Sequence, residues 1–195
     1  MSRIEPLKRE DLPAQKDLFA LVEGAMGFLP NSMLTMARKP GLVEAFGGLA
    51  GLIQMQNDLP GDLARMIGYV VSRSAGCQYC QAHTHHGAAA VGIEEEKLDA
   101  VWAYETSPLF SDAERAAFKV AQGAAQVPNG VTDADFAELK SHFTEAQVLD
   151  IVAIISLFGF LNRWNDTMAT ALEAAPLAHG AAHLAKSGWT AGKHA

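Results

Sequence analysis

Apolar residues recur along most of the chain at three- and four-residue spacing, the pattern of amphipathic helices. No segment alternates cleanly between apolar and polar residues as a half-buried strand does. Residues that stop or cap helices stand between the apolar stretches. The pattern predicts helices over residues 18–26, 31–39, 42–56, 62–74, 77–91, 94–104, 111–126, 132–142 and 144–172. The fold class that we expect is therefore all-α.

Several predicted helix starts carry a specific signal. Residues 111–114 and residues 144–147 both read as capping boxes. The longest apolar run, residues 151–161, is shorter than the roughly 20 residues that a helix needs to cross a bilayer. We therefore expect this run to be a core helix and expect no membrane partner.

The chain shows no repeat of solenoid period and no linker long enough to separate domains. We expect a single all-helical domain over residues 1–195, with its core at about 25–172. Residues 174–195, rich in Ala, Gly and His, form a C-terminal extension. We expect this extension to be loosely packed or to dock on a neighbouring subunit.

Composition narrows the function classes. The chain has 195 residues, 49% of them apolar, with a formal charge of −7 and a pI near 5.4. It has no Lys/Arg run, so we expect no nucleic-acid partner. The first eleven residues contain no apolar stretch of a signal peptide, which predicts a cytoplasmic location. In that reducing compartment a Cys pair is more often catalytic, redox-active or metal-binding than structural.

The two cysteines, Cys77 and Cys80, lie three residues apart just after Gly76. Gly76 predicts that Cys77 lies near a helix N-terminus, where backbone N–H groups and the helix dipole stabilise a thiolate. His83 lies one turn beyond Cys80 on the same face, and an imidazole there can move protons for the thiols. The spacing predicts a redox-active dithiol.

Two other interpretations of the cysteines remain open. The pair can be half of a zinc site completed by His83, His85 or His86, although structural zinc sites usually join separate segments. It can also be two inert buried thiols. A thioredoxin-type site is disfavoured because the chain shows no strands around the motif.

The segment from Gly76 to His83, between the helix over residues 63–74 and an Ala-rich helix, resembles the carboxymuconolactone decarboxylase and alkylhydroperoxidase D superfamily. The resemblance covers about residues 25–172. Residues 158–166 are similar to the last core helix of the longer members. Typical lactone decarboxylases lack the C-x-x-C, so the resemblance favours the hydroperoxidase branch.

The resemblance implies an all-helical, homo-oligomeric enzyme, commonly a dimer, trimer or hexamer. We expect no metal, flavin or nucleotide cofactor, since the sequence shows no Gly-rich phosphate loop next to a strand. It implies reduction of a hydroperoxide or another small-molecule substrate, with re-reduction by an external dithiol or protein reductant. Cys80 would attack the peroxide, and Cys77 would donate a proton and resolve the sulfenic acid. His83 would serve as proton shuttle.

Two positions depart from the family pattern. The usual glutamate, eleven residues before the first Cys, is Arg65, and the usual histidine, four residues after the second Cys, is Thr84. Arg65 can lower a thiol pKa if it points inward, or it can be a solvated surface residue. The usual Glu–His proton relay is therefore not intact at these positions.

Other polar residues have less specific interpretations. Asn162, Arg163, Asn165 and Asp166 interrupt an apolar helix and predict either a pocket wall or a subunit interface. His85 and His86 read as surface or interface residues. No partners are recognisable for His142, His179, His183 and His194.

Together these features predict a thiol-dependent oxidoreductase that reduces hydroperoxides or exchanges disulfides through Cys80 and Cys77. One alternative is a cofactor-free decarboxylase or lactone-processing enzyme in which the cysteines are incidental. Another is a non-enzymatic helical oligomer that senses redox state or binds metal.

Overall fold

The computed structural model describes residues 2–195, which contain helices and no strand. The helices are α1 (Lys16–Met26), α2 (Asn31–Met36), α3 (Leu42–Met55), α4 (Gly61–Ser74), α5 (Gln78–Ala90), α6 (Glu95–Ala100), α7 (Asp112–Ala124), α8 (Asp133–His142), α9 (Glu145–Met168) and α10 (Ala174–His183). Short 3-10 turns precede α1, follow α6 and form much of the C-terminal end. The all-α prediction is confirmed.

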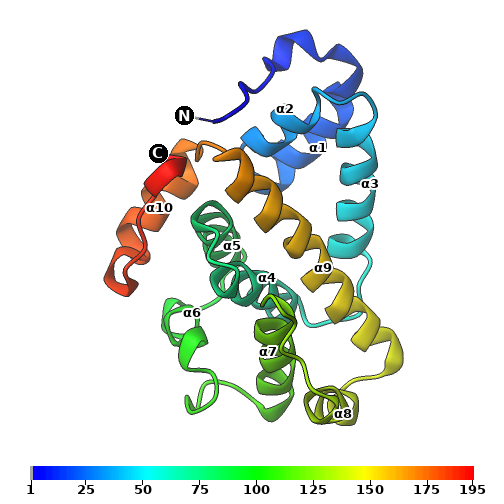
Figure 1. Cartoon of the computed structure of the whole chain (residues 1–195), viewed down its shortest axis with the longest axis vertical. Coiled ribbons are helices and arrows are strands. Elements are labelled where there is room, and N and C mark those ends of the chain that lie inside the picture. Colours follow the sequence, from blue (N-terminus) through cyan, green and yellow to red (C-terminus); the bar gives the residue numbers. More distant parts are fainter. Residues whose placement is uncertain (1) are drawn as a thin grey trace.

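Helix α9 is the long diagonal element around which the other helices are arranged (Figure 1). It contacts α3 on one side and α4, α5 and α7 on the other. The capping box predicted at Thr144 is present, with the hydroxyl accepting from Gln147 N–H. By length and composition α9 could cross a membrane, but its packing against the other helices is that of a core helix.

Helix α9 ends four residues before the predicted position. Ala169 adopts a left-handed conformation with φ 49°, and its N–H bonds the carbonyl of Asn165. This conformation is uncommon for a residue other than glycine, so an alanine at this position is not a recognisable stop signal. The chain then turns toward α10.

Two apolar clusters hold the helices together. The larger lies around α4, α5 and α7 and includes the fully buried Ile67, Phe118 and Ile151. The smaller lies among α1–α3 and includes Phe19 and Met36. Burial of one such side chain stabilises the fold by about 1.5–3 kcal/mol. Leu161 of α9 packs against both clusters and joins them.

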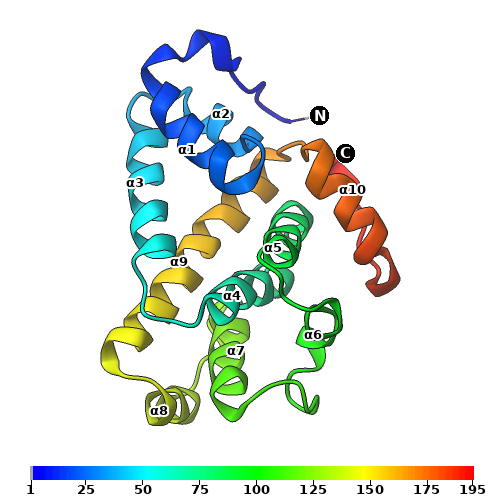
Figure 2. The ribbon, with the colours of Figure 1, turned by 180° about the vertical axis from the view of Figure 1, so that it is seen from behind.

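The C-terminal extension is not loosely packed, because it packs on the core of its own chain. Helix α10 packs against α5 of the same chain, and Figure 2 shows the two helices from behind. Trp189 Nε1 donates to the carbonyl of Gln78 at 3.0 Å. Its ring lies over Gly180, where a Cβ would come within 2.7 Å of the indole. Leu184 and Trp189 are buried in the core. The Ala- and Gly-rich composition of the segment did not indicate their burial.

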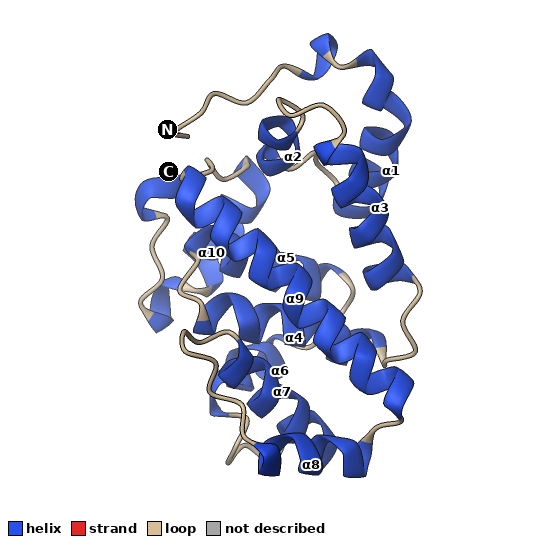
Figure 3. Cartoon of the chain, turned by 45° about the vertical axis from the view of Figure 1, so that its right-hand side comes forward, coloured by secondary structure: helices blue, strands red, loops and turns tan. Residues whose placement is uncertain are grey.

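Both chain ends lie beside the C-terminal end of α9 (Figure 3). Arg3 N donates to Met168 O at 2.8 Å, and Leu172 N donates to His194 O at 2.8 Å. These bonds bring the last residues of the chain to the end of α9, which itself packs against α5. The start of α5, the end of α9 and the C-terminus therefore meet, and the two cysteines lie at this junction.

Candidate functional site at the start of α5

A tight turn between α4 and α5 places the first cysteine. Gly76 has φ 74°, a conformation that favours glycine. Gly76 N–H bonds Arg73 O and Cys77 N–H bonds Ser72 O, the two bonds of a Schellman motif. Helix α4 therefore ends and Cys77 becomes the N-cap of α5, as the glycine predicted.

Cys77 is placed to be a thiolate. Its sulfur accepts the backbone N–H of Cys80 at 3.4 Å, at the positive end of the helix dipole. The hydrogen bond from the Cys80 thiol, aided by backbone N–H groups, outweighs burial and lowers the pKa of Cys77. Cys77 is therefore the thiol that ionises more readily.

Cys80 is the complementary, protonated partner. Burial, followed by its hydrogen bond to Cys77, raises the pKa of the Cys80 thiol well above its ordinary value. Asn165 Nδ2 donates to Cys80 Sγ at 3.5 Å and acts in the opposite direction. Both cysteines are free thiols, with relative exposures of 0% for Cys77 and 3% for Cys80.

His83 has a carboxylate partner that the sequence did not reveal. Its Nε2 lies 2.6 Å from Glu173 Oε2, and both side chains are almost buried. The His83 ring stacks on Tyr79 at a centroid distance of 4.2 Å and meets the edge of Phe28 at 5.2 Å. The packing of α10 against α5 supplies this carboxylate, because Glu173 is the residue that precedes α10.

Glu173 is held in its charged form. Its Oε1 accepts the backbone N–H of Asn31 at 2.5 Å and the hydroxyl of Tyr79 at 2.9 Å. Burial would raise the pKa of Glu173, but the His83 hydrogen bond and charge, with the Asn31 N–H, hold it below its ordinary value. A histidine facing an ionised carboxylate is suited to hold and pass a proton.

Arg65 and Thr84, which replace the glutamate and histidine of the family pattern, are not part of the His83–Glu173 pair. Arg65 is exposed, and its guanidinium reaches Gln54 of α3 at 3.5 Å, so the surface interpretation is the right one. Thr84 is buried and donates its hydroxyl to the carbonyls of Cys80 and Gln81. Glu173, which lies between α9 and α10, thus supplies the carboxylate that position 65 lacks.

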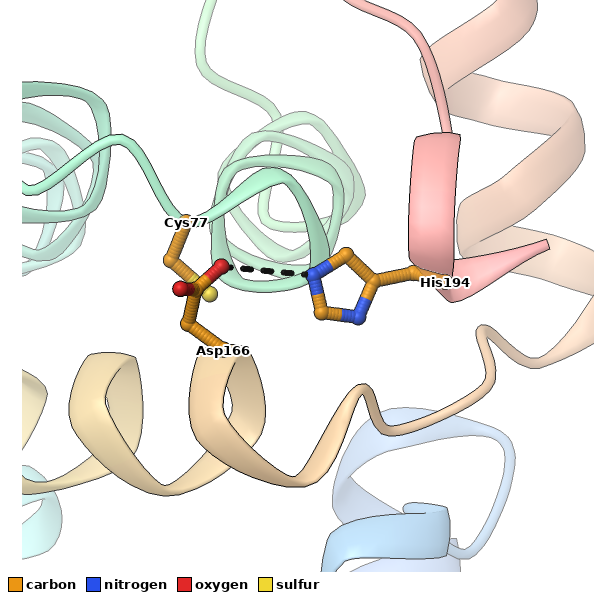
Figure 4. Close-up of side chains that lie close together, drawn as sticks. All are labelled: Cys77, Asp166 and His194. Carbon is orange, nitrogen blue, oxygen red and sulfur yellow. Dashed lines mark ion pairs between the residues drawn. The ribbon is translucent and has the colours of Figure 1, made fainter. Parts of the chain in front are cut away.

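Asp166 and His194 approach Cys77 from two other segments (Figure 4). One ligand atom from each of the three side chains lies within 4.8 Å of the others. His194 is fully buried, and burial lowers its pKa against the opposing hydrogen bond to Thr170 and charge of Asp166. Among the polar residues of α9, Asn165 and Asp166 therefore belong to a site wall, whereas Arg163 bonds Gly159 O on the exposed side.

Three of the other histidines also have partners that sequence spacing did not show. His85 is 1% exposed rather than on the surface, and its Nδ1 lies 2.8 Å from His179 Nε2. His183 stacks on His179 at 4.4 Å and pairs with Glu95. The His85–His179 and His183–Glu95 contacts join α5 or α6 to α10, so no local pattern could have revealed them, whereas His179 and His183 stack one turn apart within α10.

Two surface hollows lie elsewhere on the described part of the chain. One, of about 600 Å³, is lined by residues of α3, α4, α6 and the α5–α6 turn, among them Arg65 and Lys97. The other, of about 470 Å³, lies between α7, α8 and α9. The cysteines line neither hollow, so the chemistry of the site rests on the buried junction.

Comparisons with known proteins agree with this architecture. The family model of the carboxymuconolactone decarboxylase family matches residues 40–123. The uncharacterized protein YnjA of Escherichia coli (strain K12) is 35% identical over 92 residues, 47% of this chain. The match spans 50% of the length of this curated relative.

Solved structures extend the likeness to nearly the whole chain. The debrominase Bmp8 is 38% identical with a TM-score of 0.86, covering 90% of this chain and 94% of that one; it was crystallised as a Cys-to-Ala variant with 2,3,4-tribromopyrrole. An uncharacterized peroxidase-related protein from Ralstonia eutropha JMP134, with an alkylhydroperoxidase AhpD core, is 25% identical with a TM-score of 0.78, covering 90% and 94%. The chain therefore belongs to the carboxymuconolactone decarboxylase and alkylhydroperoxidase D-like superfamily and has its helical fold.

Proposed function

We propose that the protein is a dithiol oxidoreductase that reduces a small-molecule substrate by two electrons and closes a Cys77–Cys80 disulfide. The observation that carries the proposal is the position of the Cys77 sulfur. It caps the N-terminus of α5 and accepts the Cys80 N–H, while the Cys80 thiol stands one turn away. A low-pKa thiolate beside a second thiol is the arrangement that disulfide-forming centres use.

With a hydroperoxide, the Cys77 thiolate attacks the terminal oxygen and the O–O bond breaks. The alkoxide leaves and takes a proton, which the His83–Glu173 pair is suited to supply. Cys77 is then a sulfenic acid. The Cys80 sulfur attacks it, water leaves, and a disulfide forms. The balance is one hydroperoxide and two thiols giving one alcohol, one water and one disulfide.

This order of events differs from the one that the family resemblance implied, in which Cys80 attacks and Cys77 resolves. The proposal follows the contacts, because burial keeps the Cys80 thiol protonated while the helix N-terminus favours the Cys77 thiolate. An external dithiol then reduces the disulfide by thiol exchange and restores both thiols.

The likeness to the debrominase Bmp8 over 90% of the chain favours a second substrate class, a brominated pyrrole. The electron balance is the same. One carbon–bromine bond is replaced by carbon–hydrogen, bromide leaves with a proton, and two thiols become one disulfide. The two candidates therefore share the dithiol and differ in which bond the two electrons break.

The deciding experiment is a single-turnover mass measurement on the reduced protein. One arm receives an organic hydroperoxide and the other receives 2,3,4-tribromopyrrole. We expect the protein to lose two hydrogens in the arm that contains its substrate class, and dithiothreitol to restore the original mass. The organic product identifies which bond was broken.

Two matched variants separate the roles of the sulfurs. In Cys80→Ser we expect a sulfenic acid on residue 77 that dimedone traps after hydroperoxide treatment. In Cys77→Ser we expect neither disulfide nor trapped product. An unchanged mass in both substrate arms would overturn the proposal, and so would product formed equally by both variants.

A further inference from the structure

Three electron-pair donors meet beside the proposed dithiol, and each comes from a different segment. Cys77 caps α5, Asp166 lies in the last turn of α9, and His194 lies in the C-terminal turn Gly192–His194 (Figure 4). One atom from each side chain lies within 4.8 Å of the other two. Metal sites usually gather ligands from separate segments in this way.

The orientation of His194 leaves one ring nitrogen bare. Its Nδ1 lies 2.8 Å from the carbonyl of Thr170, and a carbonyl can only accept, so Nδ1 carries the hydrogen. Nε2 then points at Asp166 Oδ1, 3.7 Å away, and has no hydrogen-bond partner although it is completely buried. The buried Nε2 therefore lacks the hydrogen bond that a buried polar atom needs, whereas the Asp166 side chain is 45% exposed, and a cation between the two atoms would satisfy both.

The surroundings hold the imidazole as metal-binding histidines are held. In most such sites a carboxylate, a backbone carbonyl or a water accepts the second ring N–H and fixes the tautomer and the ring orientation. Here Thr170 O plays that part, and the backbone carbonyl of His194 accepts the N–H of Leu172 at 2.8 Å. The ligand is therefore oriented before any ion arrives.

The donor set selects the ion. A thiolate, an imidazole and a carboxylate are the ligands of zinc, whereas Ca²⁺ and Mg²⁺ take oxygen ligands. Asp166 is also paired with Lys193 at 2.7 Å, but that ammonium is 43% exposed and can withdraw into solvent. Three protein ligands leave the fourth tetrahedral position for water.

We propose that Cys77, Asp166 and His194 together bind one Zn²⁺ ion when the thiols are reduced. Coordination uses the Cys77 sulfur, so zinc and a Cys77–Cys80 disulfide exclude one another. The zinc site itself does not depend on the proposed reaction, because it needs only a reduced Cys77. Its consequence, inhibition of dithiol turnover by zinc, rests on the proposed function.

These ligands differ from those that the motif alone offered. The sequence suggested Cys77 and Cys80 with nearby histidines of α5. In the structure His83 Nε2 is bonded to Glu173 and His85 Nδ1 to His179. The inferred site therefore keeps one cysteine of the motif and takes its other ligands from α9 and the C-terminus.

The test titrates ZnCl2 into the reduced, chelator-treated full chain against a chromophoric zinc chelator, with no substrate present. We expect one zinc per chain, and an affinity weakened about 100-fold or more in His194→Ala and in Asp166→Asn, since even outer partners of metal ligands are worth 10- to 100-fold. Cys80→Ser should still bind zinc. The matched control is His142→Ala, which removes an exposed histidine of α8.

A second readout guards against misfolding of the His194 variant. In the Cys80→Ser protein, zinc should slow iodoacetamide alkylation of Cys77 by at least tenfold, and adding Asp166→Asn should abolish this protection. Absence of zinc binding by the reduced wild-type chain would overturn the proposal. Wild-type zinc affinity in His194→Ala and Asp166→Asn would overturn it as well. So would loss of zinc binding in Cys80→Ser.

Discussion

At the scale of single residues, the charged partner of the motif histidine is the feature that most affects the chemistry. Glu173 receives hydrogen bonds from Asn31 and Tyr79 and lies 2.6 Å from His83 Nε2. These contacts make an ionised carboxylate at a nearly buried position. His83 Nε2 faces that carboxylate, so the pair is suited to pass a proton to a leaving group and to recover it.

Replacement of Glu173 by glutamine tests this role. The amide oxygen can still accept from Asn31 and Tyr79, so the fold should persist, but the charge facing His83 is lost. We expect turnover of the dithiol to fall on the order of 10²-fold, the size of a proton-transfer contribution. The measurement is steady-state reduction of substrate with an external dithiol, together with thermal unfolding.

The control for that variant is Glu96→Gln, which makes the same replacement of a carboxylate by an amide at an exposed position of α6. It should leave the rate unchanged. A Glu173→Gln protein that unfolds normally and turns over at the wild-type rate would remove the His83–Glu173 pair from the mechanism.

At the scale of elements, the contact between α5 and α10 is notable because it buries uncharged histidines. His85 and His179 lie 2.8 Å apart between the two helices. Burial, then the neighbouring imidazoles, lowers the pKa of each to about 4, against the raising effect of the nearby carboxylate Glu95. Two protonated rings at this distance would repel each other, so the helices dock best when both are neutral.

This arrangement predicts acid sensitivity. Between pH 6.5 and about 4 the unfolded chain binds protons at residues 85 and 179 that the folded chain does not bind. Stability is therefore full above pH 6.5 and falls as the pH drops toward 4. We expect the melting temperature to decline over this window in the wild-type chain.

His179→Gln should make that decline shallower, because one titrating ring is gone and the amide can still bond His85. His142→Gln, on an exposed face of α8, should keep the wild-type slope. The measurement is thermal unfolding followed by circular dichroism at several pH values. Identical slopes for all three proteins would show that the α5–α10 contact does not control acid stability.

At the scale of the whole molecule, one helix is left with little covering. Helix α3 is strongly apolar, yet Val43 is its one buried residue. Leu49, Leu52 and Met55 are 53%, 54% and 72% exposed. An apolar helix face of this kind is typical of an interface between subunits, and a homo-oligomer is what the family resemblance implied.

We predict that a second copy of the chain covers this face. Leu52→Glu puts a charge at its centre and should shift the protein to a smaller species in light scattering after size-exclusion chromatography. The matched control is Leu109→Glu, a partly exposed leucine in the α6–α7 connection, which should leave the mass unchanged. A monomeric wild-type chain would contradict the prediction.

The sequence by itself determined the local structure and the first half of the site. Apolar spacing and capping boxes located the helices, because these signals act between residues three and four positions apart. Gly76 likewise indicated that Cys77 begins a helix, since the bonds that close that turn span at most five residues.

Only the tertiary structure decided which side chains surround the cysteines. Glu173, Asp166 and His194 reach the start of α5 because α9 and α10 pack against it, and His83 and Glu173 are 90 residues apart in sequence. Periodicity shows which face of a helix is buried but not which helix covers it. The partners of a buried polar group are therefore set by packing, since close approach of distant segments is a property of the whole fold.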